Sequence, residues 1–197
     1  LGGIGYNFFN PALLGRAFLL ASFPVAMTSA WLAPIEPLAI FQYFGSSIDA
    51  VSTATPLAVL KEQGAEAFAK QFGDGASLYT SFFLGWRPGC IGETSGFLMV
   101  LGGAYLLYRR YITWHIPVSV LGSIALLTWI FGGENGYFAG DPLLAILSGG
   151  ALLGAIYMAT DYVTSPSNKK SQIAYGIGIG ALTVLIRLKG GYPEGIC

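Results

Sequence analysis

Five mostly apolar runs, each near the ~20 residues with which a helix crosses a bilayer, limit what this chain can fold into. They are residues 12–32, 94–110, 113–132, 141–161 and 171–188. Inside lipid, a chain must satisfy its backbone N–H and C=O groups within each segment, so such runs form helices. The pattern therefore predicts an all-α integral membrane protein, built as a multi-span helical bundle.

The composition is far from that of a soluble domain. Of the 197 residues, 54% are hydrophobic and only 10% are charged, whereas soluble domains carry about 25% charged residues. The formal net charge is zero, which argues against nucleic acid as a partner. Cys90 and Cys197 are too few and too far apart for a disulfide framework or a zinc site, and metal-ligand spacing is lacking elsewhere. We expect both cysteines to be small buried residues.

Helix-start signals stand at the boundaries of two runs. Asn10 and Asp141 each precede a proline, which places a capping side chain directly before the first helical position. Pro24 should kink the first run. The short connections between the later runs predict that neighbouring helices are antiparallel.

Two glycine-rich stretches lie inside the runs, at 148–154 and 176–181, and both contain Gly-x-x-x-Gly spacing. In lipid, small residues at this spacing let helix backbones approach closely. The second stretch also has glycines at the spacing of a dinucleotide-binding loop. No strand precedes it, however, so it is expected to be a packing surface inside a helix.

Basic residues near the run ends predict the orientation in the membrane. Basic pairs at 109–110 and 169–170 flank loops on one side, whereas the connection between the third and fourth runs has no lysine or arginine. Threading the runs on this basis places the segment 33–92 on the extracytoplasmic side. Arg187 and Lys189 fall on that side as well, against the rule. Either this end of the chain folds back or these two charges have a specific role.

The segment 33–92 is not a plain linker, because an amphipathic helix is expected after Pro56. Its apolar face consists of Leu57, Leu60, Phe68 and Phe72. The opposite face consists mainly of Lys61, Glu62, Glu66 and Lys70. Such a helix lies along the membrane surface or packs on the bundle.

The most informative short motif of the chain lies in the same segment. Residues 49–55 read DAVSTAT, and Pro56 follows. This pattern looks like the sequence Asp-x-x-Ser-x-Ala-Thr, at which a flavin transferase esterifies FMN through its phosphate to the final threonine, here Thr55. As an alternative, Thr55 is an ordinary N-cap and Asp49 a turn residue. The two interpretations are compatible, because a helix N-terminus favours a phosphate group.

Three further patches accompany this motif in order along the chain, at residues 2–18, 88–96 and 190–195. Together the four resemble the NqrB/RnfD family, which contains the D component of the Rnf electron-transport complex and the B component of the sodium-pumping NADH:quinone oxidoreductase. The resemblance covers essentially the whole chain, without the family's outer helices. We therefore expect a single membrane domain, 1–197, that is a fragment of a longer chain. The sequence departs from the usual Gly-Ser-x-Gly-Glu-Thr-Ser pattern at Cys90, whose role stays open.

The resemblance implies a covalent FMN, bound by a phosphoester to Thr55. The residues that the flavin transferase would recognise are Asp49, Ser52 and Ala54. A non-covalent riboflavin is implied at Asn7 and Asn10, whose amides offer the donors and acceptors that a flavin ring edge needs. Alternatively, Asn10 is only a helix cap and Asn7 only a turn residue.

The resemblance also implies a fold like that of inverted-repeat channels, with broken helices near the midplane. Glu93 is the candidate ion-coupling residue, because a carboxylate that enters the membrane is costly and usually functional. Alternatively, Glu93 is an acidic residue that the dipole of a helix N-terminus stabilises. We expect His115 and Asp161 to be structural, with His115 hydrogen-bonded near the membrane interface.

The function that the resemblance implies is electron relay in the cell inner membrane. The chain would pass electrons between ferredoxin-side and NAD-side partners through FMN, coupled to export of Na⁺ or H⁺. Its partners would be the other Rnf subunits, and it would not be catalytic alone. Three alternatives stay open: the B component of the quinone-linked complex, a urea-channel-like solute transporter without flavin, and a purely structural assembly component.

Overall fold

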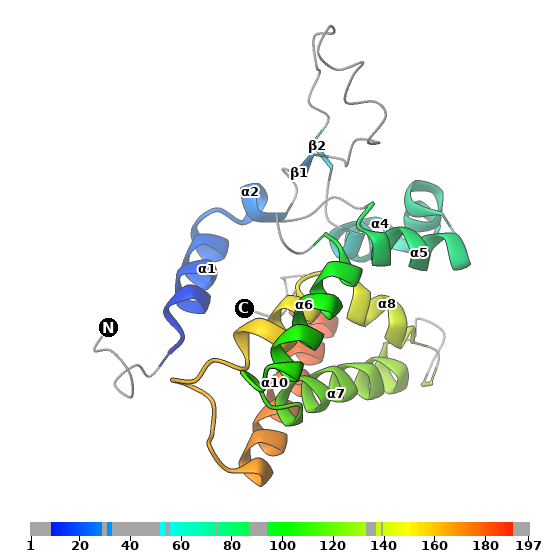
Figure 1. Ribbon diagram of the computed structural model, residues 1–197. Helices are drawn as coiled ribbons and strands as arrows, with labels where there is room; N and C mark the ends of the chain where they lie inside the picture. The colour runs from blue at the N-terminus through cyan, green and yellow to red at the C-terminus, as the bar shows by residue number, and fades with distance from the viewer. Residues whose placement is uncertain are drawn as a thin grey trace, which may run out of the picture.

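The computed structural model describes residues 9–28, 31–32, 52–53, 56–73, 75–86, 94–132, 137–138 and 140–190. Within these ranges the chain is mostly helical (Figure 1). The α-helices are α1 (Pro11–Ser22), α2 (Pro24–Thr28), α4 (Pro56–Phe72), α5 (Ala76–Leu84), α6 (Gly96–Tyr108), α7 (His115–Phe131), α8 (Pro142–Leu147), α9 (Ala151–Leu153) and α10 (Lys169–Lys189). A π-helix, η2 (Gly154–Met158), continues α9. Two short antiparallel strands, β1 (Trp31–Leu32) and β2 (Ser52–Thr53), pair with each other.

Every predicted apolar run contains helix, and the predicted starts are confirmed. Asn10 caps α1, and Asp141 caps α8. The kink expected at Pro24 is a full break, because Phe23 leaves helical geometry and Pro24 opens α2. Among the described helices, α10 alone is long and apolar enough to cross a membrane by length and composition. The helices α1, α6 and α7 are apolar but shorter.

The fourth run, 141–161, was expected to be one helix, and that prediction is wrong. Helix α8 ends at Leu147, and helical structure resumes only at Ala151. Gly149, between them, has a φ of +61°, in the left-handed region that favours glycine. The Gly-x-x-x-Gly stretch at this place therefore marks a helix break.

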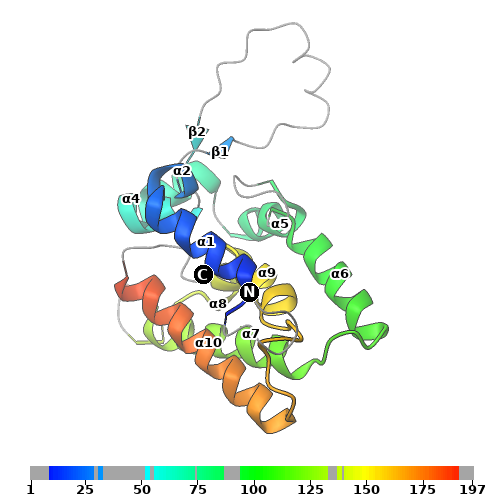
Figure 2. The ribbon, with the colours of Figure 1, turned by 90° about the vertical axis from the view of Figure 1, so that its left-hand side faces the viewer.

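The other glycine stretch is a packing surface, as predicted. A Cβ added at Gly176 would lie 1.8 Å from Ser119 Oγ, and one at Gly180 would lie 1.8 Å from Ser123 Oγ. The backbones of α7 and α10 therefore approach closely, and Figure 2 shows the two helices side by side. Because residue numbers rise together along both helices, α7 and α10 run parallel. Helices α7 and α10 belong to the third and fifth apolar runs. These two runs should be parallel if the chain reverses its direction at each connection.

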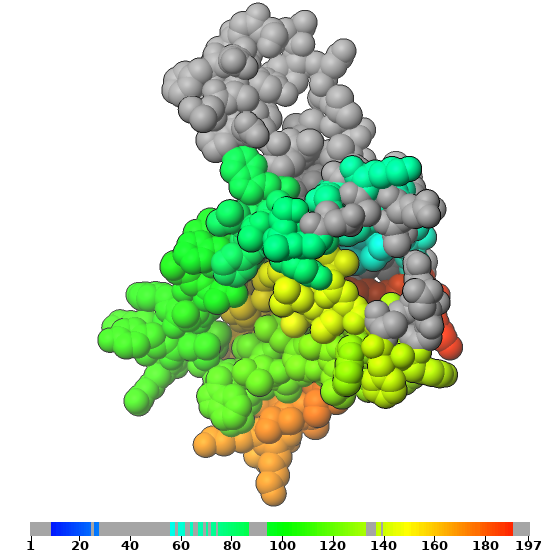
Figure 3. All heavy atoms as spheres, turned by 90° about the vertical axis from the view of Figure 1, so that its right-hand side faces the viewer, coloured from blue at the N-terminus to red at the C-terminus, as the bar shows by residue number. Residues whose placement is uncertain are grey.

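Two apolar clusters form the core of the described residues. The first joins α7 and α10 to alanines 151, 155 and 159, which follow the helix break. In the second, Val59 and Phe68 of α4 and Phe82 of α5 pack against the bundle. The helix predicted after Pro56 is present as α4 and packs on the bundle. It is not the single amphipathic helix expected, because Gly64, with a φ of +83° and a ψ of 175°, leaves helical geometry and divides it into two pieces. Helix α8 lies between α5 and α7, as Figure 3 shows.

Candidate functional site

Most of the predicted flavin and ion-coupling residues lie outside the described residues: Asn7, Asp49, Ala54, Thr55 and Glu93. Cys90 and Cys197 lie outside them too. The backbone of Ser52 is described, and it pairs with Leu32 in the strand ladder.

The helix expected directly after Thr55 is present. Helix α4 begins at Pro56, which is buried, and its first helical piece extends to the non-helical Gly64. Its first turn contains no acidic residue. A phosphate group placed before this helix would meet the positive end of the helix dipole without a repelling carboxylate in that turn. The described residues that follow Thr55 therefore fit a phosphoester at that position.

Asn10 is used as a helix cap. Its Oδ1 accepts hydrogen bonds from the backbone N–H groups of Ala12, at 2.9 Å, and Leu13, at 3.4 Å. Its Nδ2 donates to Asp161 Oδ2 at 3.4 Å, and Thr164 Oγ1 donates to the same oxygen at 3.3 Å. Asp161 thus has the structural role that we expected, since it ties α1 to the loop after η2. The amide of Asn10 retains one N–H for another partner.

His115 begins α7 and stacks on Trp114, with ring centroids 4.2 Å apart. Its Nδ1 is buried and has no hydrogen-bond partner among the described residues. The hydrogen bond expected for His115 is therefore not found at this atom.

Basic residues gather at one end of the bundle. Thr113 Oγ1, just before α7, donates to Gln172 Oε1 in the first turn of α10 at 3.0 Å. This contact joins the turn after Arg109–Arg110 to the turn that starts with Lys169–Lys170. The two basic pairs therefore lie at the same end, as the sequence predicted.

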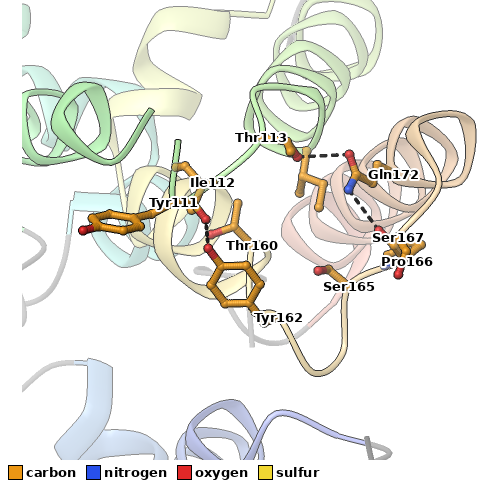
Figure 4. A pocket seen from close by; sticks show the side chains of 10 residues that line it. Tyr111, Ile112, Thr113, Thr160, Tyr162, Ser165, Pro166, Ser167 and Gln172 are labelled. Atoms are coloured by element: carbon orange, nitrogen blue, oxygen red, sulfur yellow. Dashed lines mark hydrogen bonds between the residues drawn. The ribbon is translucent and has the colours of Figure 1, made fainter. Parts of the chain in front are cut away.

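A cavity of about 130 Å³ lies at this basic end (Figure 4). On one side of the cavity, Gln172 links Thr113 to the loop before α10, because its Nε2 also donates to the backbone oxygen of Pro166 at 3.0 Å. On the other side, the Tyr162 hydroxyl donates to the backbone oxygen of Tyr111. The lining combines polar and apolar side chains and contains no charged side chain. Its hydrogen bonds close the loops between helices, so we assign it a structural role.

Arg187 has the specific role that the sequence left open. Its Nη1 donates to the backbone oxygen of Ala145 at 2.6 Å, and its Nη2 donates to that of Ser148 at 3.3 Å. The guanidinium thus binds the C-terminal end of α8 at the helix break. The sequence contains two signals of this contact: glycines in the middle of an apolar run, and an arginine on the side of the membrane that the positive-inside rule disfavours. Neither signal by itself identifies the other as its partner.

Helix α4 contacts the same region. Lys61 Nζ donates to the backbone oxygen of Arg187 at 3.2 Å and to that of Gly190. A Cβ added at Gly149 would lie 2.9 Å from Leu57 Cδ1. The helix that follows the DAVSTAT motif is therefore packed against the helix break.

Asp141 joins α5 to the start of the fourth run. Its Oδ1 caps α8 by accepting from Leu143 N at 3.0 Å and Leu144 N at 3.1 Å. Its Oδ2 accepts a hydrogen bond from the Tyr79 hydroxyl. This bond, together with burial, raises the pKa of Tyr79 above its ordinary value. Within the described ranges, no three His, Cys, Asp or Glu side chains could hold a metal ion together.

These features define a bundle of apolar helices in which a half-buried arginine binds the carbonyl oxygens at the break between α8 and α9. The family model described as "NQR2, RnfD, RnfE family" matches residues 1–197, and the chain belongs to this family. One relative is the D component of the proton-translocating ferredoxin:NAD(+) oxidoreductase complex of Clostridium ljungdahlii. The two are 52% identical over 197 residues, which cover 100% of this chain and 56% of the relative.

Two further relatives carry related names. Identity is 45% over 194 residues to the D component of the Na(+)-translocating ferredoxin:NAD(+) oxidoreductase complex of Acetobacterium woodii, covering 98% of this chain and 53% of the relative. Identity is 40% over 206 residues to the D component of the ion-translocating oxidoreductase complex of Alcanivorax borkumensis, covering 99% and 57%. The chain thus spans about half the length of the curated relatives it matches.

Proposed function

We propose that this chain is the flavin-bearing part of the D component of a membrane-bound, ion-translocating ferredoxin:NAD⁺ oxidoreductase complex. The observation that carries the proposal is the family match over all 197 residues, with relatives named as this component of such complexes. The other subunits of the complex would be its partners. The alternatives of a quinone-linked B component and of a flavin-free transporter receive no support from these relatives' names.

Thr55 is the proposed attachment site. Its hydroxyl oxygen would form the phosphoester with FMN, and Asp49, Ser52 and Ala54 would be read by the transferase that makes the bond. The N-terminus of α4 supports the proposal, because its dipole stabilises a phosphate at this position. When bound, the flavin supplies one- and two-electron transfer. The chain contributes the site, its electrostatics and the distance to partners.

A second flavin at Asn7 and Asn10 remains a prediction. The Asn10 side chain already caps α1 and binds Asp161, which leaves one N–H for a ligand. A riboflavin there would have to use that single donor of Asn10, with the remaining contacts coming from other residues.

The proposed orientation places Thr55 on the extracytoplasmic side. Both basic pairs lie at one end of the bundle, which the positive-inside rule assigns to the cytoplasm. Helix α4, which follows Thr55, instead contacts the end of α10 through Lys61. The relatives are named for both protons and sodium ions, so their names leave the transported ion open.

The test of the proposed function uses flavin that survives denaturation. The wild-type chain, expressed with the flavin transferase, should show flavin fluorescence in a denaturing gel and FMN mass on the peptide that contains Thr55. Thr55→Val should lose both signals, whereas the matched control Thr53→Val should keep them. Fluorescence retained in Thr55→Val, or a wild-type chain without covalent flavin, would refute the attachment.

A further inference from the structure

The break in the fourth run leaves oxygen atoms without the partners that a continuous helix would supply. Helix α8 ends at Leu147, and the last carbonyl groups of a helix have no intrahelical donor. The Ser148 side chain, directly after this end, is fully buried at 0% exposure. Its hydroxyl has no hydrogen-bond partner among the described residues. An unpaired polar group in such a place is costly and calls for a ligand or a function.

The guanidinium of Arg187 lies at the C-terminal end of α8. The Arg187 guanidinium donates to the carbonyl oxygens of Ala145 and Ser148, at the negative end of the α8 dipole. A Cβ added at Gly149 would lie 3.3 Å from Arg187 Nη2. The glycine therefore supplies both the left-handed turn and the space that the guanidinium needs.

We propose that the carbonyl oxygens of Ala145 and Ser148, with the Ser148 hydroxyl, form a binding site for a small monovalent cation, and that Arg187 closes it in this conformation. The inference rests on the proposed ion-translocating function. Carbonyl ends of broken helices are suited to Na⁺ and H⁺ in membrane transporters. The three ligands are neutral oxygens, which suit a single charge, sodium or hydronium. Exchange of the guanidinium for such an ion leaves the charge at these oxygens unchanged.

Helix α4 contacts both Arg187 and Gly149, so its position affects the exchange of the guanidinium for an ion. Lys61 of α4 binds the backbone oxygen of Arg187 itself, and Leu57 of α4 lies against Gly149. A shift of α4 would therefore act directly on the residue that closes the site and on the turn beside it. The segment just before α4 is the proposed flavin segment, so the geometry offers a short mechanical route between the flavin and the ion.

The test measures passive ion entry into liposomes that contain the whole complex, without electron donor. In Arg187→Gln the guanidinium charge is gone, so entry of the transported ion should rise at least about tenfold, which corresponds to a barrier lower by ~1.4 kcal/mol. Tracer sodium uptake and an internal pH dye form the two arms. A rise in the first identifies sodium, and a rise in the second identifies hydronium. Arg187→Lys, which keeps the charge, should stay close to wild type.

Lys189→Gln is the matched control, because it removes an exposed charge two positions along the same helix. An Arg187→Gln complex with normal flavin content that admits neither ion, or a Lys189→Gln complex that leaks equally, would overturn the site.

Ser148→Ala gives a second test that leaves Arg187 in place and does not depend on the stability of Arg187→Gln. By removing one ligand oxygen, it should raise the half-saturating ion concentration of coupled transport about tenfold. An unchanged value would refute the site. Failure of the proposed function would look different, because the wild-type complex itself would then lack covalent flavin or coupled electron transfer.

Discussion

The contact between α7 and α10 allows a quantitative test of the close helix packing. In Gly180→Ala, the added Cβ would lie 2.9 Å from the backbone oxygen of Val120 and 2.9 Å from Ser123 Cβ, as well as 1.8 Å from Ser123 Oγ. The hydroxyl could rotate away only by losing its 2.9 Å hydrogen bond to Val120 O. The backbone oxygen cannot rotate away, so the helices would have to separate.

The expected magnitude follows from three opposing terms. Overpacking of this kind costs about 1–3 kcal/mol, and loss of the serine hydrogen bond costs about 0.5–1.5 kcal/mol. Replacing glycine by alanine inside a helix returns about 1 kcal/mol. Gly180→Ala should therefore lose about 0.5–3.5 kcal/mol of stability. At about 2–4 °C per kcal/mol for a chain of this size, the Tm should fall by several degrees.

Gly178→Ala is the matched control, since it lies on the same helix and has no atom within 4 Å of an added Cβ. It should leave the Tm unchanged or raise it slightly. The assay is thermal unfolding of the purified protein in detergent, followed by tryptophan fluorescence. The double variant Gly180→Ala with Ser123→Gly should recover part of the loss. Equal Tm values for the Gly180→Ala and Gly178→Ala variants would refute the close contact.

Three further predictions concern single residues. Because the pKa of Tyr79 is raised, its hydrogen bond to Asp141 should stabilise the protein up to about pH 10 and lose this effect as the pH rises through the raised pKa. The difference in stability between wild type and Tyr79→Phe should therefore disappear in strong alkali. A difference that grows there would contradict this. Asn10→Ala should speed hydrogen exchange in the first turn of α1, at a cost of about 1 kcal/mol, whereas Asn10→Ser, which keeps a capping oxygen without placing a second carboxylate beside Asp161, should not. Equal exchange in both variants would count against the cap. The third prediction tests the orientation with single cysteines at two exposed positions, Lys70→Cys and Ser167→Cys, in a protein without its native cysteines. A membrane-impermeant maleimide added to intact cells should label Lys70→Cys and not Ser167→Cys. The reverse labelling pattern would invert the proposed orientation.

Local chemistry made much of the fold predictable from the sequence. Asn10 and Asp141 cap helices where the cap-proline pattern placed them, and Pro24 interrupts the first run. The glycines at 176 and 180 pack as their spacing predicted. In each case the signal that predicts the feature lies in a few neighbouring residues of the sequence. The proposed flavin site is local in the same sense, because the proposed transferase would recognise a short peptide, and Thr55 remains its predicted acceptor.

At 148–154 the glycine pattern did not reveal the break, because glycine serves both a close helix contact and a left-handed turn. Gly149 takes the left-handed turn, whereas Gly150 and Gly154 are buried. Which of the two occurs depends on a partner remote in the sequence. Arg187 reaches the carbonyl oxygens of Ala145 and Ser148 across separations of 42 and 39 residues. A continuous helix would satisfy those oxygens by itself, so the break is stable only where such a donor is available.

The sequence by itself determined the apolar runs, the helix starts and the family, since these rest on composition or on short motifs, and it predicts the flavin acceptor. The tertiary structure alone decided that the fourth run is broken, that Arg187 closes the break and that α4 packs beside it. Those outcomes depend on donors and acceptors brought together by folding. Hydrogen bonds are short-ranged, so no pattern within one segment could identify their partners.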